Sequence, residues 1–283
     1  MRLKKDLEGL NASGKLQFGY VDITMYNCPP FVMFTNHNDC GICGCELQGK
    51  VNEPESMYLW SNLVPLATYV FDIGTRCGEY SLVAAALRQD IPIISCEPNP
   101  DGFARLLINM LANDVKNIMP KRVAIANSEG FAQFGWKPKW LGHISSGGHL
   151  VSPKIRIDEK DGTLVVVQMT TLDKLTDGID LGERPVMKID VEGAEAEVFQ
   201  GMSRLLSKKP DIILETLSNP QCALINEITK PLGYNYFLIN ELDRNIIQRD
   251  RLYPANPNST NLNQFLSTRS PESILSLSSQ KKQ

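Results

Sequence analysis

Short apolar runs alternate with amphipathic segments through the central part of the chain. The run TYVFDIG at 68–74 is compact, β-branched and aromatic, and the following segment 79–90 has apolar side chains at helical spacing. Nearly continuous apolar strands that alternate with helices are typical of a parallel sheet covered by helices on both faces. The pattern therefore predicts an α/β protein with a doubly wound, mostly parallel sheet. The expected strands lie in 68–74, 91–100, 115–127, 163–175, 184–190 and 210–215, and the expected helices lie in 79–90, 101–114, 198–206 and 221–234.

The two ends of the chain differ from this central pattern. Residues 1–50 are expected to form an N-terminal extension with a short polar helix, the β-type segments FGYVDITMY and PFVMF, and a cluster of cysteines. The last segment, 267–283, is rich in Ser, Lys and Gln, and this composition predicts a mobile tail. A single large domain is therefore expected over residues 51–266.

The overall composition narrows the functional class. The 283 residues carry a formal net charge of −3, which gives no electrostatic reason to expect nucleic acid or an anionic membrane surface as a partner. No apolar run approaches the roughly 20 residues of a membrane-spanning helix. No apolar segment of the kind found in signal peptides follows the basic start, so the N-terminus is not expected to act as one. The seven cysteines are odd in number and are not spaced like a secreted disulfide framework, so a cytoplasmic protein is expected.

A glycine-containing loop, DIGTRCG, follows the first central strand. Gly74 and Gly78 follow Asp72 in the spacing D-x-G-x-x-x-G, whereas a dinucleotide-binding loop has G-x-G-x-x-G. The missing middle glycine argues against NAD or FAD, and the loop suits a ligand with a small carboxylate, such as the amino-acid end of S-adenosylmethionine. Glu97 ends the next strand about 20 residues later, where an acidic side chain can accept both ribose hydroxyls. The alternative is a turn whose glycines serve packing alone.

An acidic segment, KIDVEGAEAEVF at 188–199, joins the fifth expected strand to its helix. Asp190 ends the strand at the carboxyl edge of the sheet, where ligands of such sheets bind, and is expected to contact cofactor or acceptor. Glu192 follows on the same loop. Each has an alternative role at the helix start, as an N-cap or in a favourable interaction with the helix dipole. Lys188 lies on the same side of the strand as Asp190, so an ion pair between them is expected.

Seven stretches of the central part resemble the FkbM-type methyltransferase family in order and spacing. They are VFDIGTRCGEYS, ISCEPNP, LLINMLANDVKNI, VAIANSEG, TTLDKL, MKIDVEGAEAEVFQGMSRLL and PDIILE. The resemblance covers about residues 50–265. It implies a class I, Rossmann-like methyltransferase fold that uses S-adenosylmethionine, usually to methylate oxygen. The chain departs from the family at Thr75-Arg76, where the family usually has Ala-Asn.

The resemblance also implies cofactor contacts. The glycine loop would hold the amino-acid end of the cofactor, and the acid after the second strand would hold the ribose. The residues after the third strand would flank the adenine. The family also has an acidic position ahead of the glycine loop, and this chain has an acidic residue there. In this chain these positions are Asp72, Gly74, Thr75 and Gly78 for the loop, Glu97 with Asn99 for the ribose, Val123 and Ala124 for the adenine, and Glu55 for the acidic position.

Methyl transfer to an alcohol requires removal of a proton, so the acceptor end needs a carboxylate or a histidine within hydrogen-bond reach. Asp190 and Glu192 are the expected catalytic carboxylates. His143, in the loop WLGHISSGGHLV at 140–151, is an alternative base. The same loop contains several glycines and is expected to act as a lid or to shape the acceptor site.

A cysteine cluster in HNDCGICGC contains His37, Cys40, Cys43 and Cys45. C-x-x-C with glycines resembles a zinc knuckle, but the second C-x-x-C pair of such sites is missing. We therefore assign no metal site from the sequence and expect a glycine-rich hairpin with free thiols.

The leading function is S-adenosylmethionine-dependent O-methylation of a hydroxyl, with a sugar, a glycan or another small molecule as the acceptor. The Thr75-Arg76 exchange and the cysteine cluster leave an alternative, a cofactor-binding regulatory protein of the same fold without turnover. A nicotinamide-dependent oxidoreductase is a third, weaker alternative.

Overall fold

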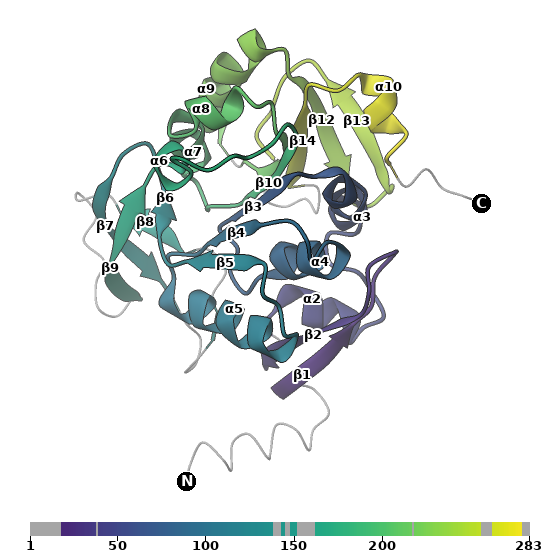
Figure 1. Ribbon diagram of the computed structural model, residues 1–283, viewed down its shortest axis with the longest axis vertical. Helices are drawn as coiled ribbons and strands as arrows, with labels where there is room; N and C mark the ends of the chain where they lie inside the picture. The colour runs from purple at the N-terminus through teal and green to yellow at the C-terminus, as the bar shows by residue number, and fades with distance from the viewer. Residues whose placement is uncertain are drawn as a thin grey trace.

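A mixed sheet forms the centre of the molecule in the computed structural model (Figure 1). The structure describes residues 18–37, 39–137, 143–144, 148–151, 162–216, 218–255 and 262–278. Within these ranges eight strands form the sheet, in the order β13-β12-β14-β11-β10-β3-β4-β5. They are β3 (Tyr69–Ile73), β4 (Ile93–Cys96), β5 (Ile118–Lys121), β10 (Pro185–Ile189), β11 (Asp211–Glu215), β12 (Asn235–Asn240), β13 (Asn245–Arg249) and β14 (Asn263–Ser267).

The directions of the strands confirm the predicted α/β fold with a mostly parallel sheet. Strands β5, β4, β3, β10 and β11 are parallel neighbours, whereas β14 pairs antiparallel with both β11 and β12. From β3 the chain extends the sheet first through β4 and β5, and then returns to add β10 and β11 on the other side. The strand order therefore reverses between β3 and β10, and ligands of open α/β sheets bind beside such a point.

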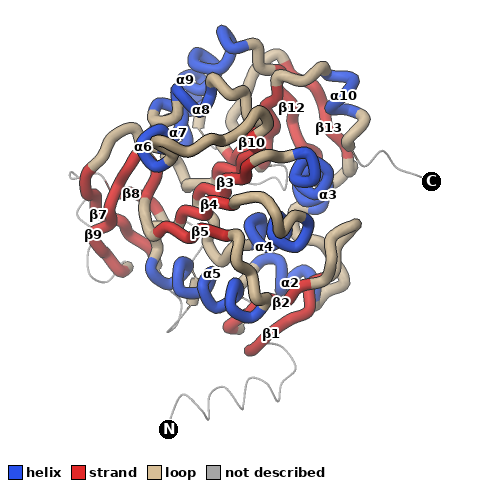
Figure 2. The backbone as a smooth tube through the Cα atoms, in the orientation of Figure 1, coloured by secondary structure: helices blue, strands red, loops and turns tan. Residues whose placement is uncertain are grey.

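The side chains of the central strands alternate between two hydrophobic cores. In β3, Val70 packs into one core, while Phe71 and Ile73 pack into the other. Helices lie on both sides of these strands, as Figure 2 shows. The first side carries α3 (Pro54–Leu63), η1 (Val64–Leu66), α4 (Glu79–Leu87) and α5 (Pro100–Ala112), and the second carries α7 (Glu195–Gln200), α8 (Ser203–Leu206), α9 (Asn219–Thr229) and η2 (Lys230–Leu232).

A second, smaller sheet lies at one end of the central sheet (Figure 1). Its strands, as far as the structure describes them, are β6 (Ala124–Ile125), β9 (Thr163–Thr170), β7 (Gly130–Trp136) and β8 (His149–Val151), in that order. The prediction that 163–175 adds a fourth strand to the parallel sheet is wrong, because β9 pairs antiparallel with β7 and parallel with β6. The apolar run indicated burial on both faces, but Val166 is 68% exposed and Val167 only 7%, so β9 is a half-buried strand. It leads into the expected short helix, α6 (Leu172–Leu175).

The N-terminal segment docks on α5. Strands β1 (Phe18–Ile23) and β2 (Phe31–Asn36) form an antiparallel hairpin, which confirms the β character expected of this segment. Asp39 accepts two hydrogen bonds from the buried Arg105 guanidinium, at 3.1 and 3.2 Å, and so ties the segment to α5. The expected cysteine hairpin is wrong, because these residues form a short helix, α2 (Gly41–Glu46). The short polar helix expected in residues 1–17 lies outside the described residues.

The C-terminal segment is ordered further than its composition predicted. β14 extends to Ser267, and α10 (Pro271–Leu275) follows, with Ser270 as its N-cap. Ile274 is fully buried against the first core. The expectation of a mobile tail is therefore wrong for residues 267–278, because Leu275 and Leu277 also pack against this core and Ser278 donates to Glu55. Residues 279–283 lie outside the described part.

Among the helices that the structure describes, none is both long enough and apolar enough to cross a membrane.

Candidate active site

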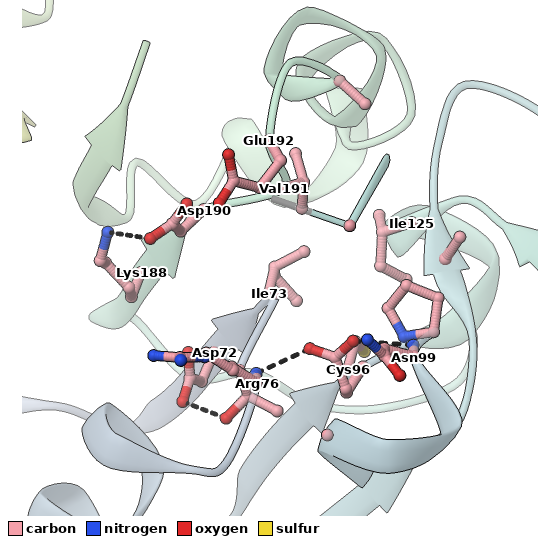
Figure 3. A pocket seen from close by; sticks show the side chains of 18 of the residues that line it. Asp72, Ile73, Arg76, Cys96, Asn99, Ile125, Lys188, Asp190, Val191 and Glu192 are labelled. Carbon is pink, nitrogen blue, oxygen red and sulfur yellow. Dashed lines mark hydrogen bonds and ion pairs between the residues drawn. The ribbon is translucent and has the colours of Figure 1, made fainter. Parts of the chain in front are cut away.

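A pocket lies at the carboxyl ends of β3, β4 and β10, beside the reversal in strand order. Figure 3 shows Lys188, Asp190 and Glu192 on one wall, and Asp72, Arg76 and Asn99 on the opposite wall. The sequence predicted ligand contacts at this edge, and the structure brings most of them together. The predicted site residues that line the pocket are Asp72, Gly74, Thr75, Glu97, Asn99, Val123, Ala124, Asp190 and Glu192.

Three predicted site residues do not line the pocket: Glu55, His143 and the loop residue Gly78. Glu55 is fully buried in the first turn of α3, where Ser278 Oγ donates to its carboxylate over 2.9 Å and Arg244 Nε lies 3.6 Å away. His143 is 7% exposed beside the N-terminal segment and does not line the pocket. Glu55 thus has a structural place, and the geometry of His143 gives no support for its role as a base.

Gly74 and Gly78 are required in the loop for different reasons. Gly74 has a φ of 83°, and its amide donates to the Cys96 carbonyl over 2.9 Å. A Cβ on Gly74 would lie 1.7 Å from the carbonyl oxygen of Asp190, so only glycine lets β3 and β10 converge at the pocket. A Cβ on Gly78 would lie 2.5 Å from Leu106 Cδ1, so this glycine serves the packing of α4 against α5.

Asp72 shapes the glycine loop from inside. Its carboxylate accepts hydrogen bonds from Thr75 Oγ1 over 2.6 Å and from the Ser81 amide over 2.9 Å. Burial raises the pKa of Asp72, although these hydrogen bonds favour its charged form. Asp72 and Thr75 therefore fix the loop, and both still face the pocket.

Arg76 takes neither of the two orientations considered from the sequence, pairing with a cofactor carboxylate or pointing to solvent. Its guanidinium donates to the carbonyl of Asp39 over 2.6 Å and to that of Ile144 over 3.2 Å. Its backbone, at a φ of 53°, directs the amide to Glu97 Oε2 over 2.7 Å. The side chain thus binds the N-terminal segment, while the backbone positions an acid of the pocket.

Glu97 presents a buried carboxylate at the end of β4. Its two oxygens accept from the amides of Arg76 and Asn99, each over 2.7 Å. Burial raises the pKa of Glu97 to about 7, against the effect of these two hydrogen bonds. Asn99 caps α5 by accepting from the Asp101 amide over 3.0 Å. The Glu97 carboxylate has further lone pairs, so it can still accept hydrogen bonds from hydroxyl groups of a ligand.

The small sheet supplies the apolar end of the pocket. Val123 and Ala124 are 6% and 4% exposed and stand before and at the start of β6. Ile125 of β6, Phe134 of β7 and Leu150 of β8 extend the same wall. A planar heterocycle fits such a wall better than a polar group does.

Lys188 is a buried positive charge at the opposite end. It is 2% exposed, its Nζ lies 3.4 Å from Asp190 Oδ2, and it donates to Asn263 Oδ1 over 2.9 Å. The ion pair predicted from the sequence is therefore confirmed. Burial works against the charge of Lys188, but the surrounding carboxylates, first among them Asp190, outweigh it and raise its pKa.

Further carboxylates surround this lysine. Glu53 lines the pocket and accepts from the Tyr80 hydroxyl over 2.6 Å and from Asn263 Nδ2 over 2.9 Å. Glu215 ends β11, and burial together with the charge of Asp190 raises its pKa to about 8. Sequence reasoning missed Glu53, Tyr80 and Asn263 as members of the site. Within N-E-P-E it chose the second acid, whereas the first one, at the N-cap of α3, faces the pocket.

The sequence comparison decides the family. A model of the methyltransferase FkbM domain matches residues 72–245, which is more than half of the chain. The chain belongs to the FkbM methyltransferase family. The match begins at Asp72 in the pocket and ends in β13, so it contains the glycine loop, Glu97 and Asp190.

Other known proteins are similar to this FkbM methyltransferase at lower levels. The hexuronic acid methyltransferase AglP of Haloferax volcanii is 27% identical over 146 residues, which are 52% of this chain and 54% of that protein. The chain thus spans about half the length of this curated relative. Two solved structures are more distant. A SAM-dependent methyltransferase of Agrobacterium tumefaciens is 10% identical with a TM-score of 0.46, over 89% of this chain and 71% of that chain. The precorrin-6y C5,15-methyltransferase of Geobacter metallireducens GS-15 is 12% identical with a TM-score of 0.41, over 76% and 85%.

The cofactor of an FkbM methyltransferase is S-adenosylmethionine, and the pocket has features that suit its parts. At Gly74 the loop presents bare backbone to the pocket, between the side chains of Asp72 and Thr75. The buried Glu97 carboxylate can accept hydroxyl hydrogen bonds, and the small sheet offers an apolar wall.

Replacing Lys188 with methionine in this FkbM methyltransferase is expected to lower the free energy of unfolding by about 3 kcal/mol at pH 8. Loss of a partner from a buried ion pair costs about 3–5 kcal/mol, and the lower end applies because the Asp190 side chain is 30% exposed. The unpaired carboxylates would have raised pKa values in the folded state. The cost should therefore be largest at about pH 8 and shrink as the pH falls through these raised values toward about 4, the pKa of a carboxyl group in the unfolded chain.

Denaturant unfolding at pH 8 and pH 5 measures this difference, with Lys208→Met as the control because Lys208 is exposed. An equal loss at both pH values would show that the charge of Lys188 does not balance the neighbouring carboxylates.

Proposed function

We propose that the protein transfers the methyl group of S-adenosylmethionine to a hydroxyl group of a sugar or glycan. The proposal rests on one observation, the excess of negative charge at one end of the pocket, where several carboxylates surround a single lysine. Glu53, Asp190 and Glu192 line this end with Lys188, and Glu215 stands behind them.

In this proposal the cofactor spans the pocket from its glycine loop to the small sheet. The loop at Gly74 receives the amino-acid end of the cofactor. Glu97 accepts hydrogen bonds from the ribose hydroxyls, next to Asn99. Val123 and Ala124 pack against the adenine. The proposal rests on the place of these residues along one continuous pocket, in which Glu97, Asn99, Val123 and Ala124 are buried and Gly74 is half-buried.

Methyl transfer is an in-line displacement that needs alignment of the acceptor oxygen with the methyl group. Positioning alone can contribute about 7–11 kcal/mol in well-oriented systems. An alcohol must also lose its proton, and we assign that proton to Asp190, whose orientation Lys188 controls. Glu192, which follows on the same loop at a φ of 56°, is the next candidate for the base.

The charge of this end favours a neutral hydroxyl over a carboxylate as the acceptor. A carboxylate acceptor needs no base and would meet several like charges that one lysine cannot balance. A hydroxyl has no charge to repel and gains from a neighbouring carboxylate that accepts its proton. The similarity to a hexuronic acid methyltransferase supports a sugar as the acceptor class.

Labelled-methyl transfer tests this function. The purified protein is incubated with methyl-labelled S-adenosylmethionine and matched pairs of oligosaccharides, one neutral and one containing a uronic acid. The product is then treated with mild alkali, which hydrolyses a methyl ester and leaves a methyl ether intact. We expect alkali-stable label in the sugar. Alkali-labile label would show a carboxylate acceptor, and cofactor binding without transfer to any acceptor would favour the regulatory alternative.

Cofactor binding should release a proton near neutral pH. Glu97 has a pKa of about 7 in the free protein, and ribose hydroxyls that donate to it favour its charged form. Binding therefore lowers this pKa, so affinity for S-adenosylhomocysteine should rise with pH between about 5 and 7 and level off above.

Titration calorimetry with S-adenosylhomocysteine at pH 6.5 in two buffers of different ionisation enthalpy measures the released proton. Glu97→Gln is the matched variant. It should bind S-adenosylhomocysteine more weakly, and its binding enthalpy should no longer depend on the buffer. Proton release that persists in Glu97→Gln would assign it to another group.

A further inference from the structure

Three ligand atoms of a kind that zinc prefers form a nearly equilateral triangle beside the pocket. Cys40 Sγ lies 3.6 Å from Cys77 Sγ, and Glu79 Oε1 lies 3.6 Å from Cys40 Sγ and 3.7 Å from Cys77 Sγ. Both thiols are fully buried and Glu79 is 9% exposed. The three residues come from different segments: the loop before α2, the glycine loop and the first turn of α4.

The edges of this triangle match a tetrahedral metal site. With Zn–S bonds of about 2.3 Å, two sulfur atoms 3.6 Å apart subtend an angle of about 103° at the metal. With a Zn–O bond of about 2.0 Å, the separation of 3.6 Å between Cys40 Sγ and Glu79 Oε1 corresponds to an angle of about 114°. Both angles are close to the tetrahedral value, so a zinc ion fits without movement of the backbone.

A fourth ligand is available in the first turn of α2. Cys43 follows Cys40 with C-x-x-C spacing, and both side chains are buried. The Cys43 thiol donates to the Met33 carbonyl over 3.7 Å in this structure. As the fourth ligand, Cys43 would have to turn its sulfur away from this carbonyl and toward the other three ligand atoms.

The carboxylate of Glu79 is already oriented for this role. Its second oxygen, Oε2, accepts from Asn52 Nδ2 over 3.1 Å, which leaves Oε1 turned toward the two thiols. Arg76 Nη1 lies 3.9 Å from Oε1 and offsets part of the negative charge that several thiolates bring. Support of a ligand by neighbouring groups of this kind is usual at metal sites.

We propose that Cys40, Cys77 and Glu79 bind a zinc ion, with Cys43 as the fourth ligand. Binding replaces the thiol protons, which pass to solvent, and forms the metal–sulfur bonds. The C-x-x-C pair therefore has its complement in Cys77 and Glu79, which lie far from it in the sequence. The ion joins the N-terminal segment to the glycine loop of the pocket.

Metal content tests the site. The full-length protein is prepared without strong chelators from cells grown with added zinc, and its zinc is measured by elemental analysis. We expect about one zinc per chain in the parent and in Cys222→Ser, whose thiol is buried elsewhere, in the second core. The double variant Cys40→Ser/Cys77→Ser should retain less than about a tenth of that amount. Equal zinc in the parent and the double variant would overturn the proposal.

A second measurement is independent of the folding of the variants. Co²⁺ is exchanged into the parent protein, and its absorption spectrum reports the ligands and their geometry. Thiolate-to-cobalt charge transfer with the intense bands of a tetrahedral ion is expected. A six-coordinate spectrum without charge transfer would overturn the proposal. A Cys40–Cys77 disulfide, found after alkylation of freshly isolated protein in acid, would overturn it as well and indicate a redox pair.

Discussion

An Asp190→Asn variant is expected to bind S-adenosylhomocysteine about as tightly as the parent protein and to transfer the methyl group about 10²–10⁴-fold more slowly. Asparagine keeps the shape of the side chain but cannot take the proton of an alcohol. It also removes the partner of Lys188, which lies 3.4 Å from the carboxylate. The loss should therefore appear in kcat rather than in cofactor affinity.

Single-turnover transfer and calorimetric binding separate these two effects. Glu197→Gln is the matched control, since Glu197 lies on the same segment but interacts with Gln221 on α9. A weaker cofactor complex with an unchanged transfer step would place Asp190 at the cofactor instead. Full activity of Asp190→Asn would move the role of the base to Glu192.

A Gly74→Ala variant is expected to lose about 3 kcal/mol or more of folding stability and most of its cofactor affinity. The added Cβ would lie 1.7 Å from the carbonyl oxygen of Asp190, so the ends of β3 and β10 must separate. An L-residue at a φ of 83° adds about 1–2 kcal/mol. The same displacement moves the loop amides, so binding of S-adenosylhomocysteine should weaken at least about tenfold.

Gly233→Ala isolates the conformational part of this cost. Gly233 has a φ of 81°, nearly that of Gly74, but a Cβ there would meet no atom within 4 Å. We expect a loss of about 1–2 kcal/mol and unchanged cofactor binding. Equal effects of the two alanine variants on unfolding would show that the pocket tolerates the separation of the strands.

Much of the fold follows from patterns that act locally. The apolar runs at 68–74 and 184–190 became β3 and β10 because both of their faces are buried. Periodicity could not reveal that β9 leaves the main sheet, since a run of valines looks the same whether one face or both are covered. The order of α10 also depends on a tertiary contact, the burial of Ile274, that composition does not show.

The site was predictable where it follows a strand and less so where it depends on segments distant in sequence. Asp72, Glu97 and Asp190 each stand at the end of a parallel strand, and the pocket contains all three. Glu53 and Asn263 come from outside the repeating β–α units, and their place beside Lys188 depends on how distant segments meet. The orientation of Arg76 likewise depends on carbonyls of the N-terminal segment and of Ile144.

The amide of Asn263 has a consequence for synthesis of the protein on the ribosome. It contacts both Lys188 and Glu53, and it follows Lys188 by 75 residues in the chain. At about 5–20 residues per second, the ribosome needs about 4–15 s to add the 75 residues from Lys188 in β10 to Asn263 in β14. During that interval the Lys188 ammonium group of β10 lacks the hydrogen bond to the amide oxygen of Asn263. Because β14 also joins β11 to β12 in the sheet, this side of the sheet and the surroundings of Lys188 are completed together, late in synthesis. Chaperones or proteases that act on nascent chains would meet the parallel strands before that step.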